Sequence, residues 1–120
     1  MADQVVYVDR FVIRDGELEN FRRYAAEMAQ LVQAKEPEAL SYHYYVDEQS
    51  GAGTAIFTFT DAAALDKHLD VMMSHFQQGA EHLSSTEIEL LGQPSERAAQ
   101  MAATYGGTVK PSLLAGFSRL

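Results

Sequence analysis

The chain has 120 residues, the length of one ordinary domain, and 47% of them are hydrophobic, which suffices for one core. Its 9 basic and 17 acidic side chains give a formal net charge of −8, which disfavours nucleic acid and anionic membrane surfaces as partners. The chain has no cysteine, which excludes disulfides, thiolate metal sites and cysteine nucleophiles.

The chain begins with a strand pattern followed by a helix pattern. Val5 to Ile13 is rich in β-branched and aromatic residues and precedes an Asp-Gly turn signal, so it predicts a strand. Leu18 to Lys35 has apolar residues at helical spacing, with Asp15 as its expected N-cap. This helix should end at Glu36, because a proline follows and disfavours helical geometry in the residue before it.

The middle of the chain predicts a β-hairpin. Ala39 to Asp47 and Thr54 to Thr60 have strand-like composition, and the flexible sequence DEQSGAG lies between them. Alternation places Tyr42 and Tyr44 on one face of the first of these strands and Tyr45 on the other. The hairpin should therefore present two neighbouring tyrosines on the same side.

Asp61 to Phe76 is the most informative segment and predicts a second long helix, capped by Asp61, which either continues or restarts through Gln77 to His82. His68 and His75 lie seven residues apart, about two turns, on its apolar face. Both imidazoles should therefore face the interior, either as satisfied core residues or as polar groups of a ligand pocket. One zinc ion bridging them is disfavoured, because they are about 10 Å apart along the helix and zinc ligands lie about 2 Å from the metal. The apolar side chains of this face are Leu65, Leu69, Met72 and Phe76.

The last third of the chain predicts a fourth strand and a C-terminal extension. Ser85 to Leu91 alternates clearly, and Ser95 to Tyr105 predicts a short helix ended by two glycines. Segment 108–120 is too apolar for a disordered end, so we expect it to pack on the body or on a partner subunit. We divide the chain into a main domain over residues 1–94 and a C-terminal helix and packing tail of the same domain over residues 95–120.

The order strand, helix, strand, strand, helix, strand predicts an α+β fold. It is the ferredoxin-like split βαβ (βαββαβ) arrangement, an antiparallel sheet with helices on one face. The strands nevertheless carry apolar residues on both faces, such as Val6 and Val8 opposite Val5 and Tyr7. A solvated face would be polar, so a second copy of the chain should cover it in a two-fold homodimer. Coverage by the C-terminal segment of the same chain is the alternative.

The sequence D-x-x-A-L-x-x-H from Asp61 to His68, followed by His75 and Phe76, resembles the antibiotic biosynthesis monooxygenase family of the dimeric α+β barrel superfamily. The resemblance extends over about residues 5–91 in element order, and it implies a homodimer whose sheets join into a barrel. Characterised members of the family oxidise phenols, quinols or polyketide aromatics with O₂ and without flavin, haem or metal. The resemblance thus implies a monooxygenase-like oxidoreductase that needs no cofactor or metal and acts on a small aromatic or quinol-like ligand.

The chain departs from the family pattern in two respects. Many members have Glu, and two residues later Trp or Tyr, at the end of the third strand, where this chain has Phe57 and Phe59. A mechanism that uses that carboxylate is therefore not implied. The chain also lacks tryptophan, and its first strand lacks asparagine, which disfavours the haem-degrading branch of the superfamily.

A cofactor-free oxygenase needs a base, a hydrogen-bond donor for an oxyanion and a dry pocket, because its deprotonated substrate must itself reduce O₂. Histidine titrates near neutral pH, so His75 is the first candidate for the base and His68 the second. Asp9 and Arg10 of the first strand are interpreted instead as an exposed edge or a subunit-interface ion pair. The candidate substrate-binding side chains are Tyr7, Tyr24, Tyr42, Tyr44, Met72 and Phe76.

Three functions remain open. The first is a cofactor-independent, monooxygenase-like enzyme that oxidises a small electron-rich aromatic or quinol with O₂. The second is a non-catalytic ligand-binding or stress-response protein, which the phenylalanines at the family's Glu and Trp/Tyr positions favour. The third is a haem-binding relative with His75 as the ligand. Because the sequence shows neither a secretory signal nor a run of roughly 18 apolar residues, we expect a cytoplasmic protein without a membrane partner.

Overall fold

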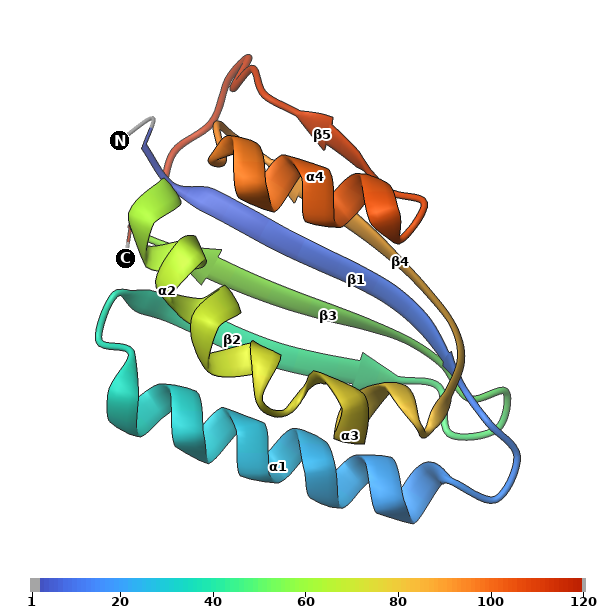
Figure 1. Ribbon diagram of the computed structural model, residues 1–120. Helices are drawn as coiled ribbons and strands as arrows, with labels where there is room; N and C mark the ends of the chain where they lie inside the picture. The colour runs from blue at the N-terminus through green and yellow to red at the C-terminus, as the bar shows by residue number, and fades with distance from the viewer. Residues whose placement is uncertain (1–2, 120) are drawn as a thin grey trace.

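The computed structural model of the protein describes residues 3–119, which form a five-stranded sheet with helices on one face (Figure 1). No helix in this part of the chain is long and apolar enough to cross a membrane. The elements in chain order are β1 (Val5–Ile13), α1 (Leu18–Lys35), β2 (Ala39–Val46), β3 (Ala52–Phe59), α2 (Ala62–Met73), α3 (Phe76–Ala80), β4 (Leu83–Leu91), α4 (Glu96–Thr104) and β5 (Thr108–Lys110).

The strand order β2-β3-β1-β4-β5 confirms the predicted ferredoxin-like α+β arrangement. β1 pairs antiparallel with both β3 and β4, and β2 completes the predicted hairpin with β3. The short strand β5 pairs parallel to β4 and extends the sheet beyond the predicted four strands. Odd-numbered residues of β1, such as Val5, Tyr7 and Phe11, are buried beneath the helices and form the centre of the core.

The predicted long helix over residues 61–76 is wrong in one respect, because α2 ends at Met73 and a new short helix begins at Phe76. The predicted cap is confirmed, since the Asp61 side chain accepts a hydrogen bond of 2.8 Å from the backbone N–H of Ala64. Behind the break, α3 approaches α1 so closely that a Cβ on Gly79 would lie 2.5 Å from the Tyr24 ring. After the break, the chain packs against α1. The last residues of the predicted helix therefore do not continue α2.

The N-cap of α1 also differs from the prediction. The residue before α1 is Glu17, whose side chain makes no capping hydrogen bond, and Asp15 lies farther back in the preceding turn. The end of the helix is as predicted, because Glu36 follows the last helical residue and its backbone N–H donates to Val32 O.

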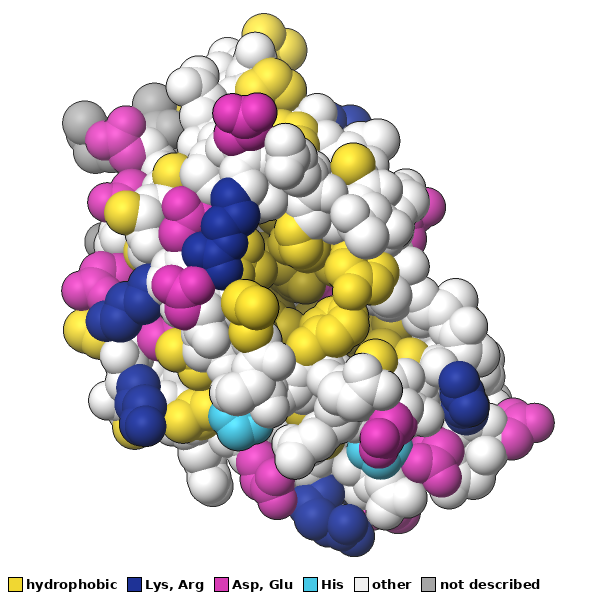
Figure 2. Space-filling view, in the orientation of Figure 1, with side chains coloured by type: hydrophobic (Ala, Val, Ile, Leu, Met, Phe, Trp, Pro, Cys, Tyr) yellow, Lys and Arg dark blue, Asp and Glu magenta, His cyan; other side chains and the backbone are white. Residues whose placement is uncertain are grey.

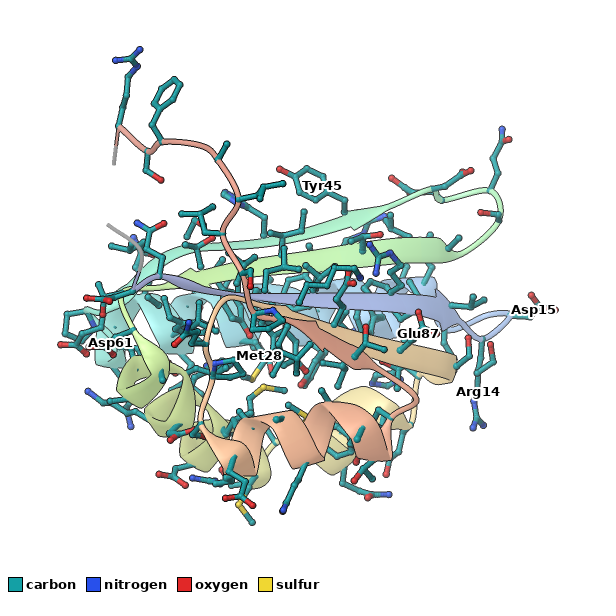
Figure 3. All side chains as sticks on the ribbon, turned by 90° about the horizontal axis from the view of Figure 1, so that it is seen from above. Arg14, Asp15, Met28, Tyr45, Asp61 and Glu87 are labelled. Carbon is teal, nitrogen blue, oxygen red and sulfur yellow. The ribbon has the colours of Figure 1, made fainter. Side chains whose placement is uncertain are left out.

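The second face of the sheet is free of helices, as Figure 3 shows with Tyr45 on that face and Met28 on the helical side. Tyr45 is 58% exposed, and other apolar side chains of this face are partly exposed as well. After β5 the chain leaves the body on the same side (Figure 3), with Leu114 and Phe117 exposed to 97% and 81%. The C-terminal segment thus does not bury these apolar side chains on its own body.

Candidate active site

A cavity lies between the sheet and the helical layer, and Figure 2 shows it as an apolar hollow on the helical side. It has two lobes of about 210 and 310 Å³. The smaller, here called the polar lobe, contains Asp9, Tyr24, Tyr44 and Thr86, and the larger, the apolar lobe, contains Leu69, Met73, Arg97 and Met101. Both lobes are lined by Tyr7, Met72, Phe76 and Tyr105, so these four residues, here called the waist, lie at the boundary between them.

Among residues 3–119, Asp9 supplies the only carboxylate that lines the polar lobe. It follows Tyr7 by two residues in β1 and therefore faces the helices, where Thr86 Oγ1 of β4 donates a hydrogen bond to its Oδ1. Burial raises the pKa of Asp9 from 3.8 to about 6, and the hydrogen bond from Thr86 opposes part of that rise. The interpretation of Asp9 as an exposed edge or interface charge is wrong: Arg10, one residue on, faces the other side, where it pairs with Glu89 at 3.3 Å.

Tyrosine hydroxyls surround the same lobe. Burial raises the pKa of Tyr24 to about 12 and that of Tyr44 still further, so both phenols are neutral donors at physiological pH. The hydroxyl of Tyr42 lies 3.1 Å from that of Tyr44, and this hydrogen bond lowers the pKa of Tyr44 while it raises that of Tyr42. Either hydroxyl can be the donor of this pair, and when Tyr42 donates, the O–H of Tyr44 is available to a molecule in the cavity.

Neither candidate histidine lines the two lobes. His68 is fully buried, and its Nδ1 lies 3.0 Å from each carboxylate oxygen of Glu36 at the end of α1. Its Nε2 is buried without a hydrogen-bond partner among residues 3–119. His75 lies in the turn between α2 and α3 and is half-buried. Of the two interpretations of these imidazoles, His68 fits the buried core residue, because Glu36 holds it in the core, and His75 lies where the helix breaks.

Most of the candidate substrate-binding residues do meet at the cavity. Of these, Tyr7, Tyr24, Tyr44, Met72 and Phe76 line it. Tyr42 lies behind it, where its ring stacks on Phe57 at 3.7 Å between ring centroids and its hydroxyl supports Tyr44.

Sequence reasoning missed Asp9, Thr86, Met101 and Tyr105 as lining residues. For Asp9 a signal was present, since alternation from Val5 and Tyr7 assigns it to the face that packs under the helices. A carboxylate at a core position is unusual and marks a candidate site. Met101 and Tyr105 gave no such signal, because only the tertiary structure shows that α4 borders the cavity.

No group of three or more His, Cys, Asp or Glu is placed to hold a metal ion within the described part of the chain. Asp9 and Glu89 lie on opposite faces of the sheet, and the carboxylates of Glu36 and Glu17 each contact a histidine, at 3.0 and 2.7 Å.

Solved structures provide the comparison with known proteins. MupZ from Pseudomonas fluorescens superposes with a TM-score of 0.81 over 98% of this chain and 95% of its own length, at 23% identity. SnoaB from Streptomyces nogalater, a cofactor-independent oxygenase, matches 78% of this chain and 96% of its own with a TM-score of 0.66 and 21% identity. This chain has the antibiotic biosynthesis monooxygenase-like fold. A candidate antibiotic biosynthesis monooxygenase from Caulobacter crescentus has the same fold, with a TM-score of 0.69 and 17% identity over 78% of this chain and 92% of its own.

The match to MupZ is longer than the other two and therefore includes the C-terminal extension of this monooxygenase-like fold. At the level of sequence, no family model matches this chain, and no curated protein is similar to it.

Proposed function

We propose that this protein is a cofactor-independent monooxygenase that oxidises a small electron-rich aromatic or quinol with O₂. The observation that carries the proposal is the position of the Asp9 carboxylate, which lies in a largely apolar cavity among neutral tyrosine hydroxyls. Activation of a phenol requires a base, hydrogen-bond donors for the phenolate oxygen and a pocket with little water. A cofactor-independent oxygenase of the same fold, SnoaB, supports the reaction class.

In the proposed mechanism Asp9 takes the base role that the sequence assigned to His75 and His68. Its carboxylate accepts the proton of the substrate hydroxyl, while Tyr44 and Tyr24 donate hydrogen bonds to the phenolate oxygen that forms. The burial that raises the pKa of Asp9 to about 6 makes its carboxylate a stronger base than an exposed one, yet leaves it ionised at neutral pH.

The subsequent steps balance without any further reactant. The phenolate gives one electron to O₂, and the two radicals combine to form a C–O bond at the ring carbon opposite the hydroxyl. That carbon then loses its proton as the O–O bond breaks, and water leaves. One phenol and one O₂ thus give one quinone and one water, and the largely apolar lining of the cavity disfavours water beside the intermediates.

A ligand-binding protein without turnover is the second candidate. Phe57 lines the cavity and Phe59 is fully buried, at the positions where the family resemblance implies Glu and Trp or Tyr. An apolar ligand retained through purification and visible by native mass spectrometry, without oxygen consumption, would favour this function. The haem-binding alternative has less support, because His75 lies outside both lobes.

We further propose that the functional form is a homodimer in which the open faces of two sheets meet. The exposed apolar side chains of that face support this assembly, since a stable monomer rarely leaves such a face in water.

Oxygen consumption by the purified protein, measured with a panel of phenols and quinols, tests the enzymatic proposal. We expect consumption of one O₂ per quinone formed, and a kcat/KM that rises with pH and reaches half of its maximum near pH 6, because Asp9 must be ionised. Asp9→Asn should lower kcat/KM by about 10²-fold or more, because it removes the base.

His75→Ala serves as the control, because His75 lies outside the cavity and its replacement should leave the rate and the pH midpoint unchanged. If the rate is unchanged in Asp9→Asn and lost in His75→Ala, the base is His75 and not Asp9. The absence of oxygen consumption with every substrate that binds would reject the enzyme in favour of the binding protein.

A further inference from the structure

The size of the polar lobe limits what it can hold by itself. Its volume of about 210 Å³ is below the about 300 to 1,000 Å³ typical of small-molecule sites. The apolar lobe adds about 310 Å³ on the other side of the waist. A molecule that fills the whole site therefore extends from one lobe into the other.

The two lobes differ in chemistry. The polar lobe offers Asp9 and the hydroxyls of Tyr24 and Tyr44, whereas the apolar lobe is lined mainly by Leu69 and the methionines of α2 and α4. Methionine side chains adapt to flexible apolar groups. The site therefore has one end for a hydroxyl and another for a hydrocarbon.

Arg97 lines the outer part of the apolar lobe, but its charge is already paired. Its Nη2 lies 2.7 Å from Oδ1 of Asp70 at the surface, so the guanidinium and the carboxylate neutralise each other. The rim consequently offers no uncompensated charge to an ionic group of a ligand. An uncharged chain is the end group that fits this lobe.

We propose that the substrate is an elongated amphipathic phenol or quinol, whose hydroxyl-bearing ring occupies the polar lobe and whose uncharged alkyl or alkenyl chain passes the waist into the apolar lobe. The chain is attached away from the ring carbon that receives oxygen. This inference rests on the proposed function for the identity of the ring, and it adds the substituent that the second lobe requires.

Isothermal titration calorimetry under nitrogen, with 3-ethyl-, 3-butyl- and 3-hexylphenol, tests the inference without turnover. Burial of each methylene contributes about 0.8 kcal/mol, so Kd should fall by about fourfold for every added methylene that enters the apolar lobe. Equal affinities for the three phenols would overturn the inference.

A pair of variants on α4 locates the chain. Met101→Trp fills the apolar lobe and should abolish the affinity gained between the ethyl and hexyl compounds, while leaving the ethyl compound bound as before. Ala103→Trp introduces the same ring two residues away on the exposed side of α4 and should leave the whole series unchanged. Loss of the gain in both variants, or in neither, would contradict the assignment of the chain to this lobe.

A milder change protects the test against misfolding. Met73 is 73% exposed at the rim of the apolar lobe, so Met73→Glu should be tolerated by the fold and should weaken the hexyl compound selectively. Unchanged hexyl affinity in this variant would count against the inference. The two proposals fail separately: a chain-length gain without oxygen consumption rejects only the enzyme, and turnover of 3-ethylphenol without a gain rejects only the elongated substrate.

Discussion

Asp9 lies beside Tyr7 on the buried side of the central strand, where an apolar residue would stabilise the fold more than a carboxylate does. Thr86 satisfies one of its oxygens by a hydrogen bond, but burial still raises the pKa of Asp9 to about 6. Near neutral pH the folded protein therefore contains an ionised carboxylate at a position that disfavours its charge. Such a cost is expected where a group is retained for chemistry rather than for stability.

The free-energy cost of the ionised Asp9 side chain can be measured because it depends on pH. The folded pKa of Asp9 lies above its unfolded value, so its protonated form favours folding below pH 4, and this contribution is lost as the pH rises through 6. Asp9→Asn should therefore leave the free energy of unfolding nearly unchanged at pH 4 and raise it by up to about 3 kcal/mol at pH 7.5. Urea unfolding at the two pH values measures the difference.

Thr86→Val gives a companion measurement. The hydrogen bond from Thr86 stabilises the ionised carboxylate, so its loss should move the pH midpoint of activity above the wild-type value. The same change in stability upon Asp9→Asn at both pH values, or a fall of the activity midpoint in Thr86→Val, would show that the environment of Asp9 is not the one described.

Two histidine–carboxylate pairs connect the ends of α1 to other elements, one in the core and one at the surface. Glu36 ends α1 and contacts His68 of α2 in the core, where both side chains are buried. Glu17 precedes α1 and contacts His82 just before β4 at 2.7 Å, where both side chains are partly exposed. The first pair fixes α2 beside the end of α1 and so sets one wall of the cavity, while the second joins two surface segments.

Replacement of the glutamate of each pair by alanine should show how strongly burial raises the contribution of such a pair to stability. Glu36→Ala should lower the free energy of unfolding by about 3 kcal/mol or more, because it leaves the buried His68 without a partner at either ring nitrogen. Glu17→Ala, the matched control at the surface, should cost much less, because solvent screens an exposed pair. Urea unfolding of both variants at one pH is the measurement, and similar costs for the two would refute the role assigned to burial.

Within residues 3–119, the folded chain exposes apolar side chains outside the cavity on the open face of the sheet and in the segment after β5. Both lie on the same side of the sheet (Figure 3). A second copy placed face to face would cover the sheet and bring Leu114 and Phe117 within range of a partner. This arrangement agrees with the two-fold symmetry that most homo-oligomers adopt.

A charge on the open face should dissociate the proposed homodimer. Ile56 is 37% exposed there, so Ile56→Glu would place a carboxylate inside the interface and should shift the mass in sedimentation velocity from dimer towards monomer. Met73→Glu, an equal charge change on the opposite side, should leave the dimer intact. A wild-type protein that sediments as a monomer at micromolar concentration would exclude the assembly.

The sequence by itself determined the order of the first four strands and the two main helices between them, the hairpin of β2 and β3, and the faces of Tyr42, Tyr44 and Tyr45. These features follow from periodicity and capping, which are local properties of the chain. It also identified most of the cavity-lining aromatic and methionine side chains, because their strand or helix faces point to the space between the layers.

Only the tertiary structure decided which polar groups meet in that space. After the break that follows α2, Gly79 packs against Tyr24 of α1, and His68 is paired with Glu36, which is 32 residues away in the chain. The pKa of Asp9 likewise depends on the helices that close over β1. The burial and the partners of a side chain depend on residues that are distant in sequence. A local pattern can therefore assign a side chain to one face of a strand or helix but cannot show which residues cover it.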